Sequence, residues 1–404
     1  MGLLMMAAVI ERSDYDVEVK NYSSATKKEA IADLPEARVY GITITSMEIP
    51  YALEFARAIK KKYRKAKVIV GGPGTVTPEL LIFDRTPIDL IVQGEADYEV
   101  LNILQNAQMF RGGIYPCTPP ENLDELPYPA RYMIRGKMGG DVFAYGKRYH
   151  GDESTVILSS RGCPFNCAFC AAPMLTSTVR YRSVESVAGE MRHVIDEYNI
   201  MQFRFSDDLF TVPRERAIKM CEAIGPLDVA WRVSARVKPL DKELLKIMKD
   251  AGCKELSFGI ESFDDDVLRL LNKRATVNDN IRALNFAEDV GIGARILLMV
   301  GTPGQTPETI RLNKMYVEAL PHTIVACTSF VPIPGSDVWY NPDKYGVEIL
   351  SRDMKDYNFY FFGPDGVNDL KPVIKLKDRP LKEFIEESKG FRQWLFERKD
   401  VNRG

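Results

Sequence analysis

Short apolar runs alternate with amphipathic stretches along the N-terminal quarter of the chain. The apolar runs predict strands at 15–22, 37–45, 66–72 and 89–95, most of them hydrophobic enough to be buried on both faces. Between the second and third runs, the segment IPYALEFARAIKKKYRK places apolar residues at helical spacing. This alternation favours a parallel, doubly wound α/β sheet.

A second alternating series follows a stretch at 112–135 that is rich in proline and turn formers. Its apolar runs predict six further strands, at 154–160, 201–207, 229–235, 254–261, 294–301 and 324–330. Amphipathic helical segments separate these runs. Six strands joined by right-handed helical crossovers fit an open or partial (β/α)6 barrel.

The residues after about 341 hold one predicted strand, NFYFF, and one predicted helix, LKEFIEESKGFRQWLFER. They are too few for an independent catalytic domain. We therefore expect four parts, a doubly wound domain, a linker, a partial barrel and a short α+β extension, at 1–115, 116–152, 153–340 and 341–404.

The composition, with 45% hydrophobic and 27% charged residues, is ordinary for a globular protein. Because 54 basic and 56 acidic residues nearly cancel, to a net charge of −2, we expect neither a nucleic acid partner nor a membrane surface. No apolar run reaches the ~18 residues of a membrane span, and MGLLMMAAVIE is expected to be an amphipathic helix rather than a signal peptide. Seven unevenly distributed cysteines favour a reducing cytoplasm.

Three of those cysteines, Cys163, Cys167 and Cys170, lie in the loop SSRGCPFNCAFC directly after the first barrel strand. Thiolates suit zinc or iron–sulfur clusters. Three thiolates do not close a tetrahedral zinc site, and the three histidines of the chain lie elsewhere in the sequence. A redox pair would need only the last two cysteines. The spacing therefore favours a four-iron cluster with one iron open to a ligand.

The segment CPFNCAFC resembles the signature of the radical S-adenosylmethionine (radical SAM) enzymes, in which an aromatic residue, here Phe169, precedes the last cysteine. The resemblance implies a [4Fe-4S] cluster whose open iron is chelated by S-adenosylmethionine. An external one-electron donor would reduce the cluster. Cleavage of S-adenosylmethionine would then give a 5′-deoxyadenosyl radical, which abstracts hydrogen from an unactivated carbon of a substrate.

Further motifs follow in the order that this family shows, over roughly 155–340. They imply an S-adenosylmethionine site made of Phe169, Asp207, Asp208, Arg236, Glu261, Arg295, Gly301 and Pro303. The two aspartates would bind the methionine ammonium, and the glutamate the ammonium or the ribose. The two arginines would bind the carboxylate, and the MVGTPGQTPETI turn would approach the adenine, with Thr306 as the cap of the next helix.

Each of these positions has a plainer alternative. Asp207 and Asp208 would suit a helix-capping pair, Glu261 a solvated side chain at a strand end, and either arginine a surface ion pair.

The N-terminal motifs GGPGTVT, IVQGEAD and NLDELPYPAR together resemble the cobalamin-binding branch of the same family, whose first domain is flavodoxin-like. The glycine loop alone would equally suit a tight turn. The resemblance implies that cobalamin lies along Gly71, Gly72, Gly74 and Gly94 and over the loop Thr45, Ser46, Met47 and Glu48. No Asp-x-His-x-x-Gly motif offers a histidine to the cobalt.

One departure affects this domain. The family domain opens with a buried central strand, whereas this sequence begins at the following helix, so two neighbouring strands would lack a partner. Three explanations are open: the strand order is rearranged, a partner supplies the missing strand, or the true start of the protein lies upstream. A degenerate domain kept for substrate docking is the alternative to cobalamin binding.

We expect a cobalamin-dependent enzyme that methylates an unactivated carbon of a small molecule. Radical oxidation, cyclisation or rearrangement is the alternative, and a non-catalytic scaffold is an alternative of another class. Methylthiolation of transfer RNA is disfavoured, because extra N-terminal cysteines and a basic RNA-binding module are absent from the sequence. Cys117, Cys221 and Cys253 are expected to be small buried hydrophobes, and Cys327 is the one candidate for a radical-quenching catalytic residue.

Overall fold

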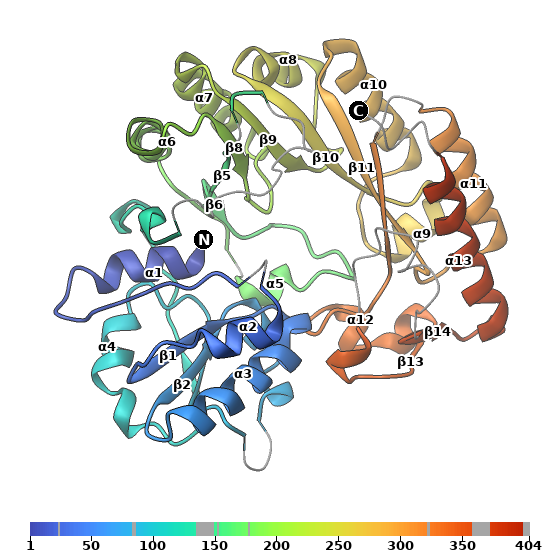
Figure 1. The fold of residues 1–404 in the computed structure, drawn as a ribbon. Helices are drawn as coiled ribbons and strands as arrows, with labels where there is room; N and C mark the ends of the chain where they lie inside the picture. The colour runs from blue at the N-terminus through green and yellow to red at the C-terminus, as the bar shows by residue number, and fades with distance from the viewer. Residues whose placement is uncertain are drawn as a thin grey trace. The chain divides into compact units, whose positions relative to one another are not determined.

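The computed structural model describes residues 1–22, 25–82, 86–134, 149–151, 153–176, 178–320, 324–357 and 372–398. The chain divides into two compact units (Figure 1). The N-terminal unit comprises 1–138, 174–176 and 353–355, and the barrel unit comprises 139–173, 177–352 and 356–404.

The N-terminal unit contains a parallel four-stranded sheet in the order β1-β2-β3-β4. Its elements are α1 (Gly2–Ile10), α2 (Lys27–Ala32), β1 (Val39–Thr43), α3 (Ile49–Lys62), β2 (Lys67–Gly71), β3 (Leu90–Gln93), α4 (Val100–Gln105) and β4 (Ile114–Pro116). Ile69, Leu90, Val92 and Ile103 form a buried core cluster in this unit, which accounts for the apolar runs of β2 and β3.

Two predictions for this sheet are wrong. Residues 15–22 form no strand; instead, Val17 and Val19 pack against a small cluster that includes Ala7 and Ala8 of α1. The fourth strand is β4, in the stretch whose composition predicts only turns and linker. The alternating valines give the sequence pattern of a strand. A β-strand forms, however, only where a neighbouring backbone supplies its hydrogen bonds. β1 is bonded to β2 alone among the described strands.

The barrel unit holds a six-stranded parallel sheet in the order β12-β11-β10-β9-β8-β5. The strands are β5 (Thr155–Ile157), β8 (Gln202–Phe205), β9 (Ala230–Ala235), β10 (Cys253–Glu261), β11 (Gly293–Val300) and β12 (Ile324–Ser329). All neighbouring pairs are parallel. The six predicted strands are therefore confirmed in their order, as an open α/β barrel sheet.

Helices connect these strands, and all of them except α9 lie along the outside of the sheet (Figure 1). They are α6 (Val184–Tyr198), α7 (Arg214–Ile224), α8 (Lys242–Asp250), α9 (Asp265–Leu270), α10 (Val277–Val290) and α11 (Pro307–Glu318). Side chains of Ser183, Asp241 and Thr276 cap α6, α8 and α10. The predicted cap Thr306 is confirmed, because its side chain accepts the Thr309 N–H at the start of α11.

Shorter elements complete the barrel unit. The cysteine loop includes β6 (Ser160–Arg161), which pairs antiparallel with β7 (Arg180–Tyr181). The short α5 (Ala172–Leu175) begins in the barrel unit, and its last two residues are assigned to the N-terminal unit. The C-terminal part holds α12 (Asp337–Tyr340), an antiparallel pair of β13 (Val347–Ile349) and β14 (Ile374–Leu376), and α13 (Leu381–Glu397). The predicted final helix is confirmed as α13. The predicted strand NFYFF lies outside the described residues.

An aromatic cluster packs where β8 and β9 meet the helices. The Phe205 ring centroid lies 4.8 Å from that of Phe210 and 5.4 Å from that of Trp231, and all three side chains are fully buried. The Trp231 indole donates a 2.7 Å hydrogen bond to the Ala251 carbonyl. Large rings held by neighbours on several sides leave a cavity that is hard to refill when one is removed.

We therefore expect Phe205→Ala to lower the free energy of unfolding by about 3–5 kcal/mol. The matched control is Phe396→Ala on α13, whose ring is 43% exposed and whose removal is expected to cost less than about 0.5 kcal/mol. Urea unfolding of the purified apoprotein, followed by circular dichroism, measures both. Equal destabilisation by the two variants would contradict this packing.

Candidate active site

The three clustered cysteines lie on the loop that leaves the carboxyl end of β5 and continues through β6. All three thiols are free; Cys167 is buried, whereas Cys163 and Cys170 are half-buried. The Cys170 N–H donates to the Cys167 carbonyl at 3.0 Å, which closes a tight turn between the last two cysteines. Burial raises the pKa of the Cys170 thiol to about 11 and also raises the pKa of the Cys163 thiol.

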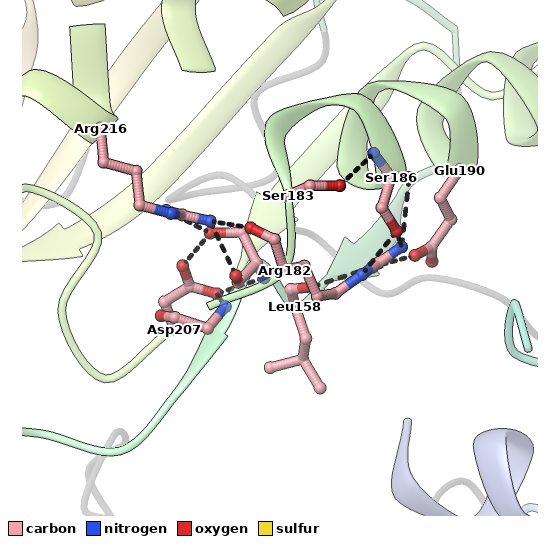
Figure 2. A network of polar contacts seen from close by, with 9 residues as sticks. Leu158, Arg182, Ser183, Ser186, Glu190, Asp207 and Arg216 are labelled. Carbon is pink, nitrogen blue, oxygen red and sulfur yellow. Dashed lines mark hydrogen bonds and ion pairs between the residues drawn. The ribbon is translucent and has the colours of Figure 1, made fainter. Parts of the chain in front are cut away.

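The beginning of this loop is held by Asp207, which follows β8 (Figure 2). Its carboxylate accepts the Ser159 N–H at 2.7 Å, the Ser160 N–H at 3.2 Å and the Ser159 hydroxyl. Arg216 of α7 adds bonds of 2.8 Å to the Ser159 carbonyl and 3.1 Å to the Arg182 carbonyl. Burial raises the pKa of Asp207, although the bonds from Ser159 and Ser160 oppose that shift. This carboxylate thus fastens the strand end.

A buried ion pair lies beside these residues (Figure 2). Arg182 pairs with Glu190 of α6, and the side chains are 9% and 2% exposed. The same guanidinium donates to the Leu158 carbonyl at 3.0 Å and to the Ser186 hydroxyl at 3.0 Å. Buried charges persist only when they are paired and hydrogen-bonded, and both conditions hold here. The network thereby ties α6 to the end of β5.

Asp208 holds the next residue of the loop. Its Oδ2 accepts the Gly162 N–H at 3.2 Å, and burial raises its pKa. Gly162 has φ +101°, a left-handed conformation that glycine adopts readily. The helix-capping alternative for the two aspartates is wrong, because the N-cap of α7 is Pro213 and it receives no side-chain bond.

A second loop, residues 271–274 and here called the bracing loop, holds the middle of the cysteine loop. The Ala168 N–H donates to the Leu271 carbonyl at 2.9 Å. The Asn272 side-chain amide donates to both the carbonyl (2.9 Å) and Oδ1 (3.0 Å) of Asn166, and Arg274 donates to the same Oδ1 at 3.2 Å. Asn272 and Arg274 have φ of +52° and +54°. No sequence motif that we used pointed to this loop.

Glu261 forms a buried ion pair with Lys273 of the bracing loop. Oε1 and Nζ are 2.7 Å apart, and the two residues are 8% and 4% exposed. The solvated-side-chain alternative for Glu261 is therefore wrong. Glu261 has φ +65° and lies at a register shift of β10. A side chain at Gly259 would approach Oε1 to 2.6 Å and Nζ to 2.8 Å, so glycine leaves room for the pair.

Arg236 follows β9 and reaches the same loop. Its Nη1 lies 3.2 Å from the Cys167 Sγ, and its Cζ lies 3.9 Å from the centroid of the Phe165 ring. Its Nη2 donates to the Lys273 carbonyl. These partners replace the surface ion pair that was the alternative for Arg236. Phe169 also faces the bracing loop, with the Lys273 Nζ 5.8 Å from its ring centroid.

The remaining predicted positions differ in how near they lie to the carboxyl ends of the strands. Gly301 directly follows β11 and has φ +80°, its N–H donates to the Gln305 Oε1 at 2.6 Å, and Pro303 is buried in the same turn. Arg295 lies five residues before Val300, about 16 Å from that end at ~3.3 Å per residue. Its buried Nε has no hydrogen-bond partner among the described residues.

The other cysteines lie apart from the cluster loop. Cys221 and Cys253 are buried, as predicted, whereas Cys117 is only half-buried. Cys327 is buried in β12, and burial raises its pKa to about 12, so it is a neutral thiol at neutral pH. A role in radical quenching stays a prediction.

In the N-terminal unit, the predicted cobalamin residues meet at the carboxyl ends of β1 and β2. The Gly74 N–H donates to the Ile44 carbonyl at 2.8 Å. A side chain at Gly72 or Gly74 would clash with residues 43–45, at 2.5–2.9 Å from their nearest atoms. Thr45 is fastened by the Glu48 carboxylate, which accepts its N–H at 2.6 Å. The glycines therefore let two loops touch, which a tight turn alone would not require.

Gly94 and Gly71 differ from these two glycines. Gly94 has φ +96°, and a side chain there would approach the Cys117 carbonyl to 2.9 Å. A side chain at Gly71 would make only ordinary contacts, the nearest at 3.7 Å with Val92. At the end of the glycine loop, the Thr77 hydroxyl is buried and has no hydrogen-bond partner among the described residues. An orphaned buried hydroxyl at the end of this loop fits a polar cofactor that would supply its hydrogen-bond partner.

The donor set of the cysteine loop fits an iron–sulfur cluster. It offers three thiols and no histidine or carboxylate within the loop itself. Among the described residues, no group of three or more His, Cys, Asp or Glu side chains is compact enough to hold a single metal ion.

The fold and this loop define an open α/β barrel with a three-cysteine loop after its first strand, preceded in the chain by a doubly wound domain. Family models agree: that of the radical SAM superfamily matches residues 157–312, and that of the B12 binding domain matches residues 1–104. The chain thus carries a radical SAM domain that follows a B12-binding domain along the sequence. Its cofactors are a [4Fe-4S] cluster, S-adenosylmethionine and cobalamin.

Similar proteins include an uncharacterized methyltransferase of Pyrococcus horikoshii, 29% identical over 93% of this chain and 83% of that protein. The anaerobic magnesium-protoporphyrin IX monomethyl ester cyclase of Rubrivivax gelatinosus is 23% identical over 94% of this chain and 71% of its own length. The radical S-adenosylmethionine methyltransferase TsrM from Kitasatospora setae, solved with cobalamin and a [4Fe-4S] cluster, shares the fold with a TM-score of 0.66. It is 18% identical and covers 87% of this chain and 74% of its own.

No helix among the described residues is both long and apolar enough to cross a membrane.

The contacts of Asn272 predict that the bracing loop keeps the cysteine loop in shape. We expect Asn272→Ala to release iron from the reconstituted protein about ten times faster than the native chain, because it removes two hydrogen bonds and places alanine at positive φ. Asn272→Gly also removes the two hydrogen bonds but tolerates that φ, so its rate of iron release should lie between those of the native chain and Asn272→Ala. Chelator-driven bleaching of the cluster absorbance measures the rates.

The matched control is Asn278→Ala on an exposed position of α10. Iron release from Asn272→Ala that is as slow as from this control would show that the bracing loop does not hold the cysteine loop.

Proposed function

We propose that this protein transfers a methyl group to an unactivated carbon of a small molecule. The observation that carries the proposal is the union, on one chain, of the braced three-thiol loop with a B12-binding domain. When bound, the cluster supplies the electron that cleaves S-adenosylmethionine to a 5′-deoxyadenosyl radical, and cobalamin supplies a methyl carrier. Similarity to a methyltransferase over 93% of the chain supports this reaction.

In this proposal Cys163, Cys167 and Cys170 hold the cluster. Residues at the carboxyl ends of β8, β10 and β11 bind and orient S-adenosylmethionine together with the aromatic residue of the cysteine loop: Phe169, Asp207, Asp208, Glu261, Gly301 and Pro303. Asp207 and Asp208 act mainly by positioning the loop, since their oxygens already accept its N–H groups. Arg236 and Arg295 stay candidates for binding the carboxylate of S-adenosylmethionine. Arg295 is the weaker candidate, because it lies five residues before the carboxyl end of β11.

In this proposal, cobalamin lies along the loop Thr45–Glu48, along the glycines at the start of the β2–β3 connection and along the glycine that follows β3. The residues concerned are Thr45, Ser46, Met47, Glu48, Gly71, Gly72, Gly74 and Gly94. The boundaries 1–115, 116–152, 153–340 and 341–404 remain our proposed domain limits. Residues 136–152 of the proposed linker lie almost wholly outside the described residues.

The second candidate function is radical oxidation, cyclisation or rearrangement without methyl transfer. Similarity to a cyclase over 94% of the chain favours keeping it. In either case we propose a small-molecule substrate and an external one-electron donor. The near-neutral charge balance supports the absence of a nucleic acid partner, and seven free thiols support a cytoplasmic location.

Product analysis separates these functions. The reconstituted protein, incubated anaerobically with S-adenosylmethionine and dithionite, is expected to form 5′-deoxyadenosine, and S-adenosylhomocysteine only when hydroxocobalamin has been added. Liquid chromatography with mass detection quantifies both. Formation of 5′-deoxyadenosine alone under both conditions would favour the second candidate function.

The matched variants are Cys167→Ala and Cys117→Ala. The first removes a thiol of the cluster loop and is expected to abolish 5′-deoxyadenosine, whereas the second removes a thiol outside that loop and should retain it. Persistence of 5′-deoxyadenosine in Cys167→Ala would contradict the role of Cys167 in holding the cluster. Absence of 5′-deoxyadenosine from the native protein would contradict the proposed function and leave the scaffold alternative.

A further inference from the structure

The three thiols of the cysteine loop receive different hydrogen bonds. Cys163 and Cys170 each accept a backbone N–H from two residues ahead, from Phe165 and from Ala172, the latter at 3.4 Å. Cys167 instead accepts from a cationic side chain, the Nη1 of Arg236, at 3.2 Å. One of the three sulfurs is thus bonded to a full positive charge, whereas its two neighbours are bonded to neutral dipoles.

The guanidinium of Arg236 is held in place by contacts on two further sides. Its Cζ stacks 3.9 Å from the centroid of the Phe165 ring, and Nη2 donates to the Lys273 carbonyl. Because the Phe165 ring and the Lys273 carbonyl already fix the planar guanidinium, it loses little additional conformational entropy when it donates to the sulfur. The contact with Cys167 therefore follows from a built arrangement and does not depend on a mobile surface side chain.

The neighbouring cation has its own partner. The Lys273 Nζ pairs with the Glu261 carboxylate at 2.7 Å, so its charge is compensated within the site. Within the described part of the chain, the Arg236 guanidinium forms no such ion pair, and its partners are the Cys167 sulfur, the Lys273 carbonyl and the Phe165 ring. Arg236 is consequently the cation whose field acts on the cluster sulfur.

We propose that Arg236 is a positioning residue for the cluster, which stabilises the reduced cluster by a charge-assisted hydrogen bond to the Cys167 sulfur. The inference rests on the proposed function, since it requires the three cysteines to hold a cluster. Reduction adds one negative charge to the cluster and its thiolates, and hydrogen bonds to the sulfurs favour the more negative state. An external donor then reduces the cluster more completely at a given potential.

The same side chain has one further donor. The Arg236 Nε is buried and has no hydrogen-bond partner among the described residues. The carboxylate of S-adenosylmethionine would suit it, as the sequence prediction for Arg236 requires. The two roles can be told apart when S-adenosylmethionine is absent. Loss of a hydrogen bond to the Cys167 sulfur would then still change the reduction of the cluster, whereas loss of a carboxylate ligand would not.

The test is a potentiometric titration of the reconstituted protein without S-adenosylmethionine, read by the electron paramagnetic resonance of the reduced cluster. At the midpoint potential of the native protein, Arg236→Met is expected to lower the ratio of reduced to oxidised cluster about tenfold, which is 59 mV for one electron. Arg236→Lys keeps the charge but loses the fork, and should fall between the two. Arg192→Gln on an exposed position of α6 is the matched control and should not shift the ratio.

Unchanged ratios in Arg236→Met and Arg236→Lys would overturn the inference. If those ratios are unchanged while the Kd for S-adenosylmethionine rises more than tenfold, Arg236 is a carboxylate ligand instead. If Arg236→Met fails to assemble a cluster, the ratio of reduced to oxidised cluster in Arg236→Lys decides whether the inference holds. Failure of the native protein to assemble a four-iron cluster would overturn the proposed function itself, which separates the two failures.

Discussion

The interaction on which the site depends is the grip of two carboxylates on the first half of the cysteine loop. Asp207 accepts the N–H groups of Ser159 and Ser160, and Asp208 accepts that of Gly162. Buried backbone N–H groups need acceptors, and at the start of this loop the two carboxylates supply them. The cost is a pair of carboxylates whose pKa values are raised by burial.

The bracing loop completes this grip from the other side, through Asn166 and Ala168. Its left-handed residues turn the chain so that Lys273 meets Glu261 and its carbonyl meets Arg236. The cysteine loop is therefore held by elements that follow β8, β9 and β10, all at the carboxyl ends of parallel strands. A cofactor bound there would find its ligands already oriented, which reduces the entropy lost on binding.

Local pattern was enough to predict the barrel strands, the final helix and the Thr306 cap, because burial period and capping chemistry act over a few residues. It failed for residues 15–22, where alternating valines pack against α1 without a neighbouring strand. The bracing loop and the Arg236 contact with Cys167 join residues far apart in the sequence. Such contacts depend on the register of the folded chain, which periodicity does not reveal.

The central claim is that the cysteine loop carries a cluster whose open iron binds S-adenosylmethionine. Electron paramagnetic resonance of the dithionite-reduced native protein, recorded before and after addition of S-adenosylmethionine, tests it most directly. The g values of the reduced cluster should change on addition, and Cys167→Ala should give no such signal. A four-iron signal that is identical with and without S-adenosylmethionine would contradict the claim.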